Sequence, residues 1–219
     1  MCISQPVGRN ATANRDNTTT VQILLNLNLD KLIGIPLLSE DGVAGPATIG
    51  AIEEFQRSVV GLKTPDGRVD PHGLTLRKLR EGMAIGFTER HLRGIMIHAT
   101  PANIAKYFPR LKQNMAVNGI DRPLRQAHFL AQIAHESAEL RYCEEIASGS
   151  AYEGRVDLDS ADRPALAVDV ACWFWMEHGL NTLADKDDVV RVTRVINGGL
   201  NGLTDRQSKL VRAKFFLVR

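Results

Sequence analysis

The chain has 219 residues, of which 44% are hydrophobic and 24% charged, and its formal net charge is +2. This length allows one large domain or two modest ones, and the composition is that of a globular protein with a buried core. The small net charge argues against the concentrated basic face of nucleic-acid-binding domains. No apolar run approaches the roughly 18 residues of a membrane span. We therefore expect neither a nucleic-acid partner nor a membrane span.

Residues 1–20 are polar and lack the basic start and apolar run of a secretory signal. We expect them to form a flexible lead-in, and we expect synthesis in the cytoplasm. The three cysteines, Cys2, Cys143 and Cys172, have neither the number of a disulfide framework nor the spacing of a zinc site. A bridge between Cys143 and Cys172 stays open. The sequence indicates no metal and no cofactor.

Residues 21–82 predict a compact helical domain, followed by a connector over residues 80–90. A helix-like run begins at Val21, and apolar residues return at helical spacing over residues 47–60. Two turn segments, at residues 41–48 and 66–71, share the pattern Asp-Gly-x-x-(Gly/Asp)-Pro, each followed by a threonine and a helix. The domain therefore contains a short internal sequence repeat.

From about Leu92 the pattern is helical, with few strand signals. The expected helices cover residues 101–118, 121–146, 163–179, 185–197 and 204–217. Pro123 suits the first turn of the second of these helices, and Gly198 is a natural stop for the fourth. We predict an all-α fold with two domains, the second over residues 90–219.

Glu136 is the first candidate for chemistry. Over residues 121–146 a buried stripe runs at steps of three and four, and His135 and Glu136 flank it. Partial burial and the negative end of the helix dipole both favour the protonated carboxyl, which a general acid needs. Periodicity alone favours a solvated surface glutamate.

The first turn segment carries a resemblance to a known domain. Asp41-Gly42, Gly45-Pro46 and Thr48, followed by Phe55-Gln56-Arg57, resemble the small three-helix peptidoglycan-binding domain appended to many cell-wall hydrolases. The resemblance implies binding of bacterial peptidoglycan by residues 21–82. The turn glycines and the core phenylalanine also fit a purely structural role.

Four blocks of the second domain, in the same order, resemble family 19 glycoside hydrolases, which are the chitinases and phage endolysins of the lysozyme-like superfamily. The blocks are Phe129–Tyr142, Ser148–Arg155, Ala171–Trp175 and Val192–Gly202, the last followed by Asp205-Arg206. The resemblance implies a lysozyme-like helical domain.

Carried over onto these blocks, the resemblance makes Glu136 the general acid, Asn197 a substrate contact and Arg206 a buried charge partner that supports the site. His135, Ser137 and Tyr142 flank the acid as further candidates for substrate binding. Asn197 also fits a helix cap. Trp173 and Trp175 are expected in the core rather than as sugar platforms.

The second carboxylate has two candidates, Glu145 and then Glu153. On an unbroken helix Glu145 would lie about 13 Å along the axis from Glu136, beyond the roughly 6.5–9.5 Å that separates the carboxyls of inverting glycosidases. Glu145 can serve only if the helix ends and the chain folds back soon after Ser137. Glu139 is expected to be solvated.

The chain departs from its endolysin relatives after Arg155. There the relatives carry a block that lines the sugar cleft, whereas here residues 155–162 run almost directly into the next helix. We expect either a shallow, open cleft or a cleft wall that is supplied by something else.

Together these features predict a monomeric peptidoglycan hydrolase that cleaves the β-1,4 bond between N-acetylmuramic acid and N-acetylglucosamine. Without a signal, it would act in the periplasm or outside the cell after release or injection. The alternatives are a chitinase and a non-catalytic wall-binding protein with a decayed hydrolase domain.

Overall fold

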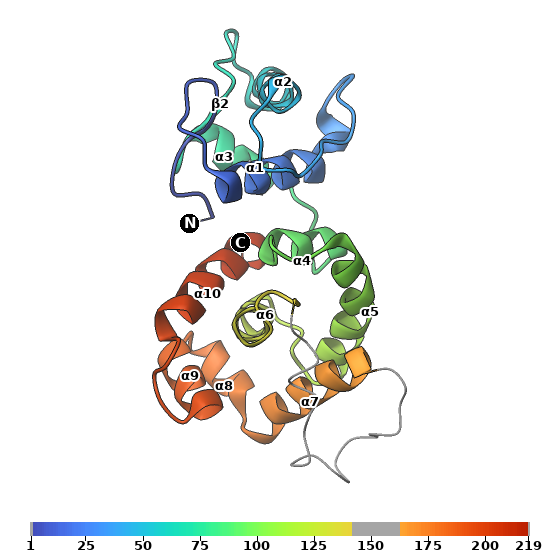
Figure 1. Ribbon diagram of the computed structural model, residues 1–219, viewed down its shortest axis with the longest axis vertical. Helices are drawn as coiled ribbons and strands as arrows, with labels where there is room; N and C mark the ends of the chain where they lie inside the picture. The colour runs from blue at the N-terminus through green and yellow to red at the C-terminus, as the bar shows by residue number, and fades with distance from the viewer. Residues whose placement is uncertain (1, 142–162, 219) are drawn as a thin grey trace. The chain divides into compact units, whose positions relative to one another are not determined.

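The computed structural model describes residues 2–141 and 163–218 of the chain (Figure 1). The chain divides into two compact units, Met1–Ile85 and Gly86–Arg219, and the boundary falls inside the connector predicted for residues 80–90. The described residues form ten α-helices and one pair of two-residue strands, so the all-α prediction is confirmed. No helix in the described ranges combines the length and the apolar character needed to cross a membrane.

The first unit packs its helices around a small apolar core. Its elements are β1 (Val7–Gly8), α1 (Arg15–Leu27), η1 (Leu29–Lys31), α2 (Pro46–Phe55), η2 (Gln56–Val60), β2 (Arg68–Val69) and α3 (Leu74–Glu81). β1 and β2 pair antiparallel, with Val7 opposite Val69. The η2 segment is a π-helical continuation of α2, and it ends at Gly61, whose φ of 82° suits a residue without a Cβ.

The prediction of a flexible lead-in over residues 1–20 is wrong. β1 lies within it, Ile3 and Val7 are buried, and α1 already begins at Arg15. Asn14 caps that helix by accepting a hydrogen bond from the Asn17 amide at 2.9 Å. Residues 17–20 of α1 are buried although they are polar. Hydrophobic periodicity therefore becomes visible only at Val21 and misplaces the start of the helix.

The short internal repeat at residues 41–48 and 66–71 is associated with two buried glutamines. The Gln22 side chain lies inside the first turn, where its Nε2 donates to Asp41 Oδ1 at 2.9 Å, to the Val43 carbonyl at 3.1 Å and to Thr48 Oγ1 at 3.1 Å. Its Oε1 accepts from the Gly42 amide at 2.9 Å. One amide side chain therefore satisfies the polar groups of a whole turn.

Gln56 does the same in the second turn. Its Nε2 donates to Asp66 Oδ1 at 2.6 Å, to the Arg68 carbonyl at 2.9 Å and to Thr75 Oγ1 at 3.2 Å, while its Oε1 accepts from the Gly67 amide at 2.9 Å. The repeated Asp-Gly pattern therefore marks two turns that each enclose a buried glutamine side chain. Buried polar groups have to be paired, which explains why each Asp-Gly turn occurs together with a glutamine.

The second unit surrounds one central helix. Its elements are α4 (Glu89–Ile95), α5 (Pro101–Val117), α6 (Pro123–Glu136), α7 (Arg163–Glu177), α8 (Leu180–Asp185), α9 (Val189–Asn197) and α10 (Leu203–Leu217). Figure 1 views α6 end-on, with the other helices of this unit around it. Every residue from 127 to 134 is buried, as expected for a helix enclosed on all sides.

The helix predicted over residues 121–146 ends at Glu136. Ala138, Glu139 and Leu140 all adopt positive φ, at 46°, 62° and 63°, which reverses the chain directly after the cap residue Ser137. Left-handed backbone is disfavoured for residues with a Cβ, so the sequence carries no glycine signal for this end. The short helices α4 and α8 were not predicted.

We expect Gln56→Glu to destabilise the first unit. The variant removes the donor to Arg68 and Thr75 and places two carboxylates in contact at Asp66. The free energy of unfolding of this unit should fall by about 1–3 kcal/mol, read from hydrogen exchange of amides in α1–α3. Gln5→Glu, at an exposed position of the same unit, is the control. Equal protection in the two variants would contradict the role given to Gln56.

Candidate functional site

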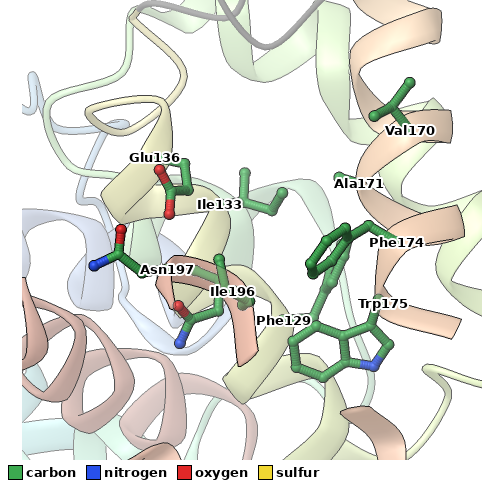
Figure 2. Close-up of a pocket in the computed structure, with 10 residues that line it drawn as sticks. Phe129, Ile133, Glu136, Val170, Ala171, Phe174, Trp175, Ile196 and Asn197 are labelled. Atoms are coloured by element: carbon green, nitrogen blue, oxygen red, sulfur yellow. The ribbon is translucent and has the colours of Figure 1, made fainter. Parts of the chain in front are cut away.

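A pocket of about 260 Å³ opens between α6, α7 and the end of α9 (Figure 2). Its lining residues are Phe129, Gln132, Ile133, Glu136, Val170, Ala171, Phe174, Trp175, Ile196 and Asn197. In Figure 2 the Glu136 carboxylate and the Asn197 amide lie at one end of the pocket, and the rings of Phe174 and Trp175 lie toward the other. The pocket is therefore polar at one end and apolar along its walls.

Glu136 is the last residue of α6, and a buried arginine holds its carboxylate. The Arg206 side chain, from α10, is 1% exposed, whereas that of Glu136 is 42% exposed. Arg206 donates through Nη2 to Glu136 Oε1 and through Nη1 to Gln132 Oε1. A buried charge needs a paired partner, so this contact fixes the carboxylate at the pocket and fastens α10 to α6.

Ser137 takes part in ending the helix and does not line the pocket. Its hydroxyl donates to the Ile133 carbonyl at 2.6 Å and accepts from the Leu140 amide at 2.8 Å, and the residue is buried. Both hydrogen-bonding directions are used inside the turn. The structure thus places Ser137 as the support of the turn that follows Glu136.

Glu139 is buried, so the expectation that it is solvated is wrong. It lies in the left-handed turn and accepts hydrogen bonds from Lys209 Nζ, from the His98 amide at 2.8 Å and from His98 Nδ1 at 3.1 Å. Burial raises the pKa of Glu139, but the bonds from Lys209 and His98 outweigh burial and leave the pKa below its ordinary value. Glu139 therefore anchors the turn as a carboxylate.

His135 and Asn197 occupy different positions relative to the pocket. His135 Nδ1 donates to Asp205 Oδ2 at 2.7 Å, and its ring lies against Gly202, so it joins α6 to the start of α10 outside the pocket lining. Asn197 ends α9 before the left-handed Gly198 and lines the pocket. Its Nδ2 donates to the Asn201 carbonyl at 3.3 Å, which leaves its amide oxygen available at the mouth.

Helix α7, which carries Trp175, forms one wall of the pocket. Trp175 is buried, lines the pocket, donates from Nε1 to Asn181 Oδ1 at 2.9 Å and meets the Phe129 ring edge-on at 5.3 Å between centroids. Cys172 on the same helix is a buried free thiol, and burial raises its pKa to about 12. Cys172 therefore packs as an apolar side chain, and Trp175 belongs to both the core and the pocket.

Tyr142, Glu145, Glu153 and the segment after Arg155 lie outside the described residues. Both candidates for the second carboxylate, and the expected open side of the cleft, are among them. In the described parts of the chain, no three His, Cys, Asp or Glu side chains converge as metal ligands. The described site thus consists of one accessible carboxylate, its arginine, and two amide side chains.

Gln132 and Lys209 are the site residues that sequence reasoning missed. Gln132 lies one helical turn before Glu136, on the same side of α6, and this spacing was the available signal. Lys209 lies one turn after Arg206 on α10. Arg206 reaches Glu136 at the end of α6, and Lys209 reaches Glu139 in the turn that follows.

No protein-family model matches this chain, and no solved structure matches it significantly. The family 19 resemblance stays a prediction that rests on the four sequence blocks.

A buried histidine lies on α6, outside the pocket. His128 Nε2 contacts Asp187 Oδ1 at 2.7 Å, and Asp187 also accepts from Lys214. Burial lowers the pKa of His128, and it outweighs the opposing effects of Asp187 and Asp188, while Lys214 acts in the same direction as burial. His128 is therefore held neutral in the folded protein.

We expect the second unit to lose stability as the pH falls below about 6.5, the ordinary value for histidine. Below that pH, His128 takes up a proton more readily in the unfolded chain than in the folded chain. The free energy of unfolding therefore decreases as the pH falls. Urea unfolding across this range should show a flatter pH dependence for His128→Gln than for the wild type. The control, His72→Gln in the first unit, should keep the wild-type dependence; an unchanged slope in His128→Gln would contradict the assignment.

We also expect Glu139→Gln to weaken the turn after Glu136. The variant keeps the size of the side chain but removes the charge that pairs with Lys209, which should lower the free energy of unfolding of the second unit by about 1–3 kcal/mol. Urea unfolding at neutral pH measures this. Glu177→Gln, at the exposed end of α7, is the control and should have no effect. An equally small change in both variants would contradict the anchoring role given to Glu139.

Proposed function

We propose that the protein is a peptidoglycan hydrolase that cleaves the β-1,4 bond between N-acetylmuramic acid and N-acetylglucosamine, with Glu136 as the general acid. The observation that carries the proposal is the accessible Glu136 carboxylate at a pocket, fixed by the buried Arg206 and accompanied by the Asn197 amide. Glycosidic cleavage requires a pair of carboxyl groups that flank the scissile bond, and Glu136 is proposed as the acid of that pair.

In this mechanism protonated Glu136 donates its proton to the glycosidic oxygen as the bond to the anomeric carbon breaks. The carboxylate left behind is stabilised by Arg206, whose contact strengthens as negative charge develops on the oxygen. The guanidinium cannot itself donate a proton at neutral pH, so it acts on charge alone. Asn197, at the same end of the pocket, is positioned to bind the sugar.

The base that activates water is assigned to Glu145, with Glu153 as the second candidate. Because α6 ends at Glu136 and the chain reverses over residues 138–140, the separation of about 13 Å calculated for an unbroken helix does not apply. The reversal supports a role for a carboxylate that follows Glu136 closely in sequence.

The first unit is assigned to binding peptidoglycan, which raises the local concentration of substrate for the second unit. The protein is proposed to act as a monomer on the wall, in the periplasm or outside the cell, after release or injection.

The test compares wild type, Glu136→Gln and Glu177→Gln on purified peptidoglycan, with release of reducing ends as the readout. We expect Glu136→Gln to lower the rate by about 100-fold or more, because glutamine keeps the hydrogen bond from Arg206 but has no proton to donate. Glu177→Gln should match the wild type.

Three other results would replace the proposal. Full activity of Glu136→Gln would refute this acid, and faster release from chitin than from peptidoglycan would favour a chitinase. A wild type without hydrolysis that still sediments with peptidoglycan would favour a wall-binding protein.

A further inference from the structure

Three asparagines of the second unit are followed directly by glycine: Asn118, Asn197 and Asn201. At such a pair the backbone nitrogen of the glycine can attack the side-chain carbonyl carbon of the asparagine, because glycine has no Cβ to block the approach. The attack releases the side-chain nitrogen as ammonia and leaves a cyclic imide. It requires a backbone nitrogen that no hydrogen bond holds, and a base that takes its proton.

Hydrogen bonds protect the first two pairs. The Gly198 amide, which follows Asn197, donates to the Arg194 carbonyl at 2.9 Å. The Gly119 amide donates to the Ala116 carbonyl at 3.3 Å, and the side chain of the preceding asparagine donates to a backbone carbonyl of α5 at 2.8 Å. In both pairs the nitrogen has to lose a hydrogen bond before it can attack.

The third pair lies in the turn that joins α9 to α10. The Leu203 amide donates to the Leu200 carbonyl at 3.1 Å, so Asn201 and Gly202 are the two central residues of a β-turn. Within the described ranges, neither the Gly202 amide nor the Asn201 side chain has a hydrogen-bond partner. Asn201 is also exposed, so water reaches its side chain. Both reacting groups of this pair are therefore unrestrained by hydrogen bonds.

A histidine that is oriented by a carboxylate lies against the same glycine. His135 Nδ1 and Asp205 Oδ2 are 2.7 Å apart, and because a carboxylate only accepts, Nδ1 carries the proton. In its neutral form the ring then has its lone pair at Nε2. A Cβ built on Gly202 would lie 2.5 Å from His135 Nε2, an approach that only glycine permits. A base therefore lies beside the residue whose nitrogen has to lose a proton.

We propose that Asn201 is a site of self-catalysed deamidation, with His135 as the general base. His135 Nε2 takes the proton of the Gly202 amide as that nitrogen forms a bond to Cγ of Asn201. The proton then passes to the side-chain nitrogen, whose bond to Cγ breaks, and ammonia leaves. One water molecule opens the cyclic imide and gives aspartate or isoaspartate.

The modification changes the surroundings of the pocket. The Asn201 carbonyl accepts the hydrogen bond from Asn197 Nδ2 at 3.3 Å, and Asn197 lines the pocket. Isoaspartate inserts a methylene group into the backbone at that point, which displaces the acceptor. The inference goes beyond the proposed function and does not depend on hydrolysis of any polymer.

The test follows deamidation of freshly prepared full-length protein at neutral pH by tryptic digestion and mass spectrometry. Trypsin cleaves after Arg194 and Arg206, so Asn197 and Asn201 share one peptide, and fragmentation assigns the modified residue. A synthetic peptide of residues 195–206 is the unfolded reference. We expect Asn201 to deamidate about tenfold or more faster in the protein than in the peptide, because only the fold supplies the base. Asn197 should deamidate more slowly in the protein than in the peptide.

His135→Gln removes the base, and His178→Gln, at an exposed position after α7, is the matched control. In His135→Gln the rate at Asn201 should fall about tenfold or more, while Asn197 stays as slow as in the wild type and reports that the fold is kept. His178→Gln should match the wild type at both asparagines.

Two results overturn the proposal. The first is a rate at Asn201 in the wild type that is no higher than in the peptide, and this comparison holds even if His135→Gln does not fold. The second is a wild-type rate at Asn201 in a His135→Gln protein that still protects Asn197.

Discussion

The second unit depends on one buried cation. Arg206 lies 1% exposed inside the helical ring, and both acceptors that the structure gives it, Gln132 and Glu136, come from the central helix α6. Unpaired, a guanidinium at that depth would be strongly destabilising, so these contacts favour the observed register of α10 on α6. The same contact orients the Gln132 amide and holds the Glu136 carboxylate. Arg206 therefore links the packing of α10 on α6 to the position of two pocket residues.

The backbone strain of this unit is concentrated beside the same residues. Three successive residues with a Cβ adopt left-handed backbone after Ser137, a conformation that costs about 1–2 kcal/mol for each of them. Contacts on both sides offset this cost, because Ser137 closes the helix end and the buried Glu139 is bound by Lys209 and His98. The reversal leaves Glu136 at a helix terminus, where its side chain reaches solvent.

The sequence predicted what local patterns encode and missed what distant contacts decide. The stripe on α6 and Pro123 gave the helical class and the start of that helix. The sequence did not show its end at Glu136, because Ala138 and Glu139 carry no glycine-like signal. Distant contacts of Lys209 and His98 hold Glu139 in the turn. The polar first turns of α1 hid the packed N-terminal segment. The resemblance singled out Glu136, Asn197 and Arg206. It did not single out Gln132, whose contact with Arg206 comes from a distant helix.

The spacing of Gln132 and Glu136 has a consequence for the proposed chemistry. Four residues of α-helix span about 6 Å along the axis, which is the scale of one sugar unit. Under the proposed function, one sugar unit is therefore long enough to contact both side chains. Both side chains accept a hydrogen bond from Arg206, so a shift of the guanidinium moves the Gln132 amide and the Glu136 carboxyl group together. Under the proposed function, binding of the sugar and cleavage of its bond are coupled through one buried residue that lies outside the pocket lining.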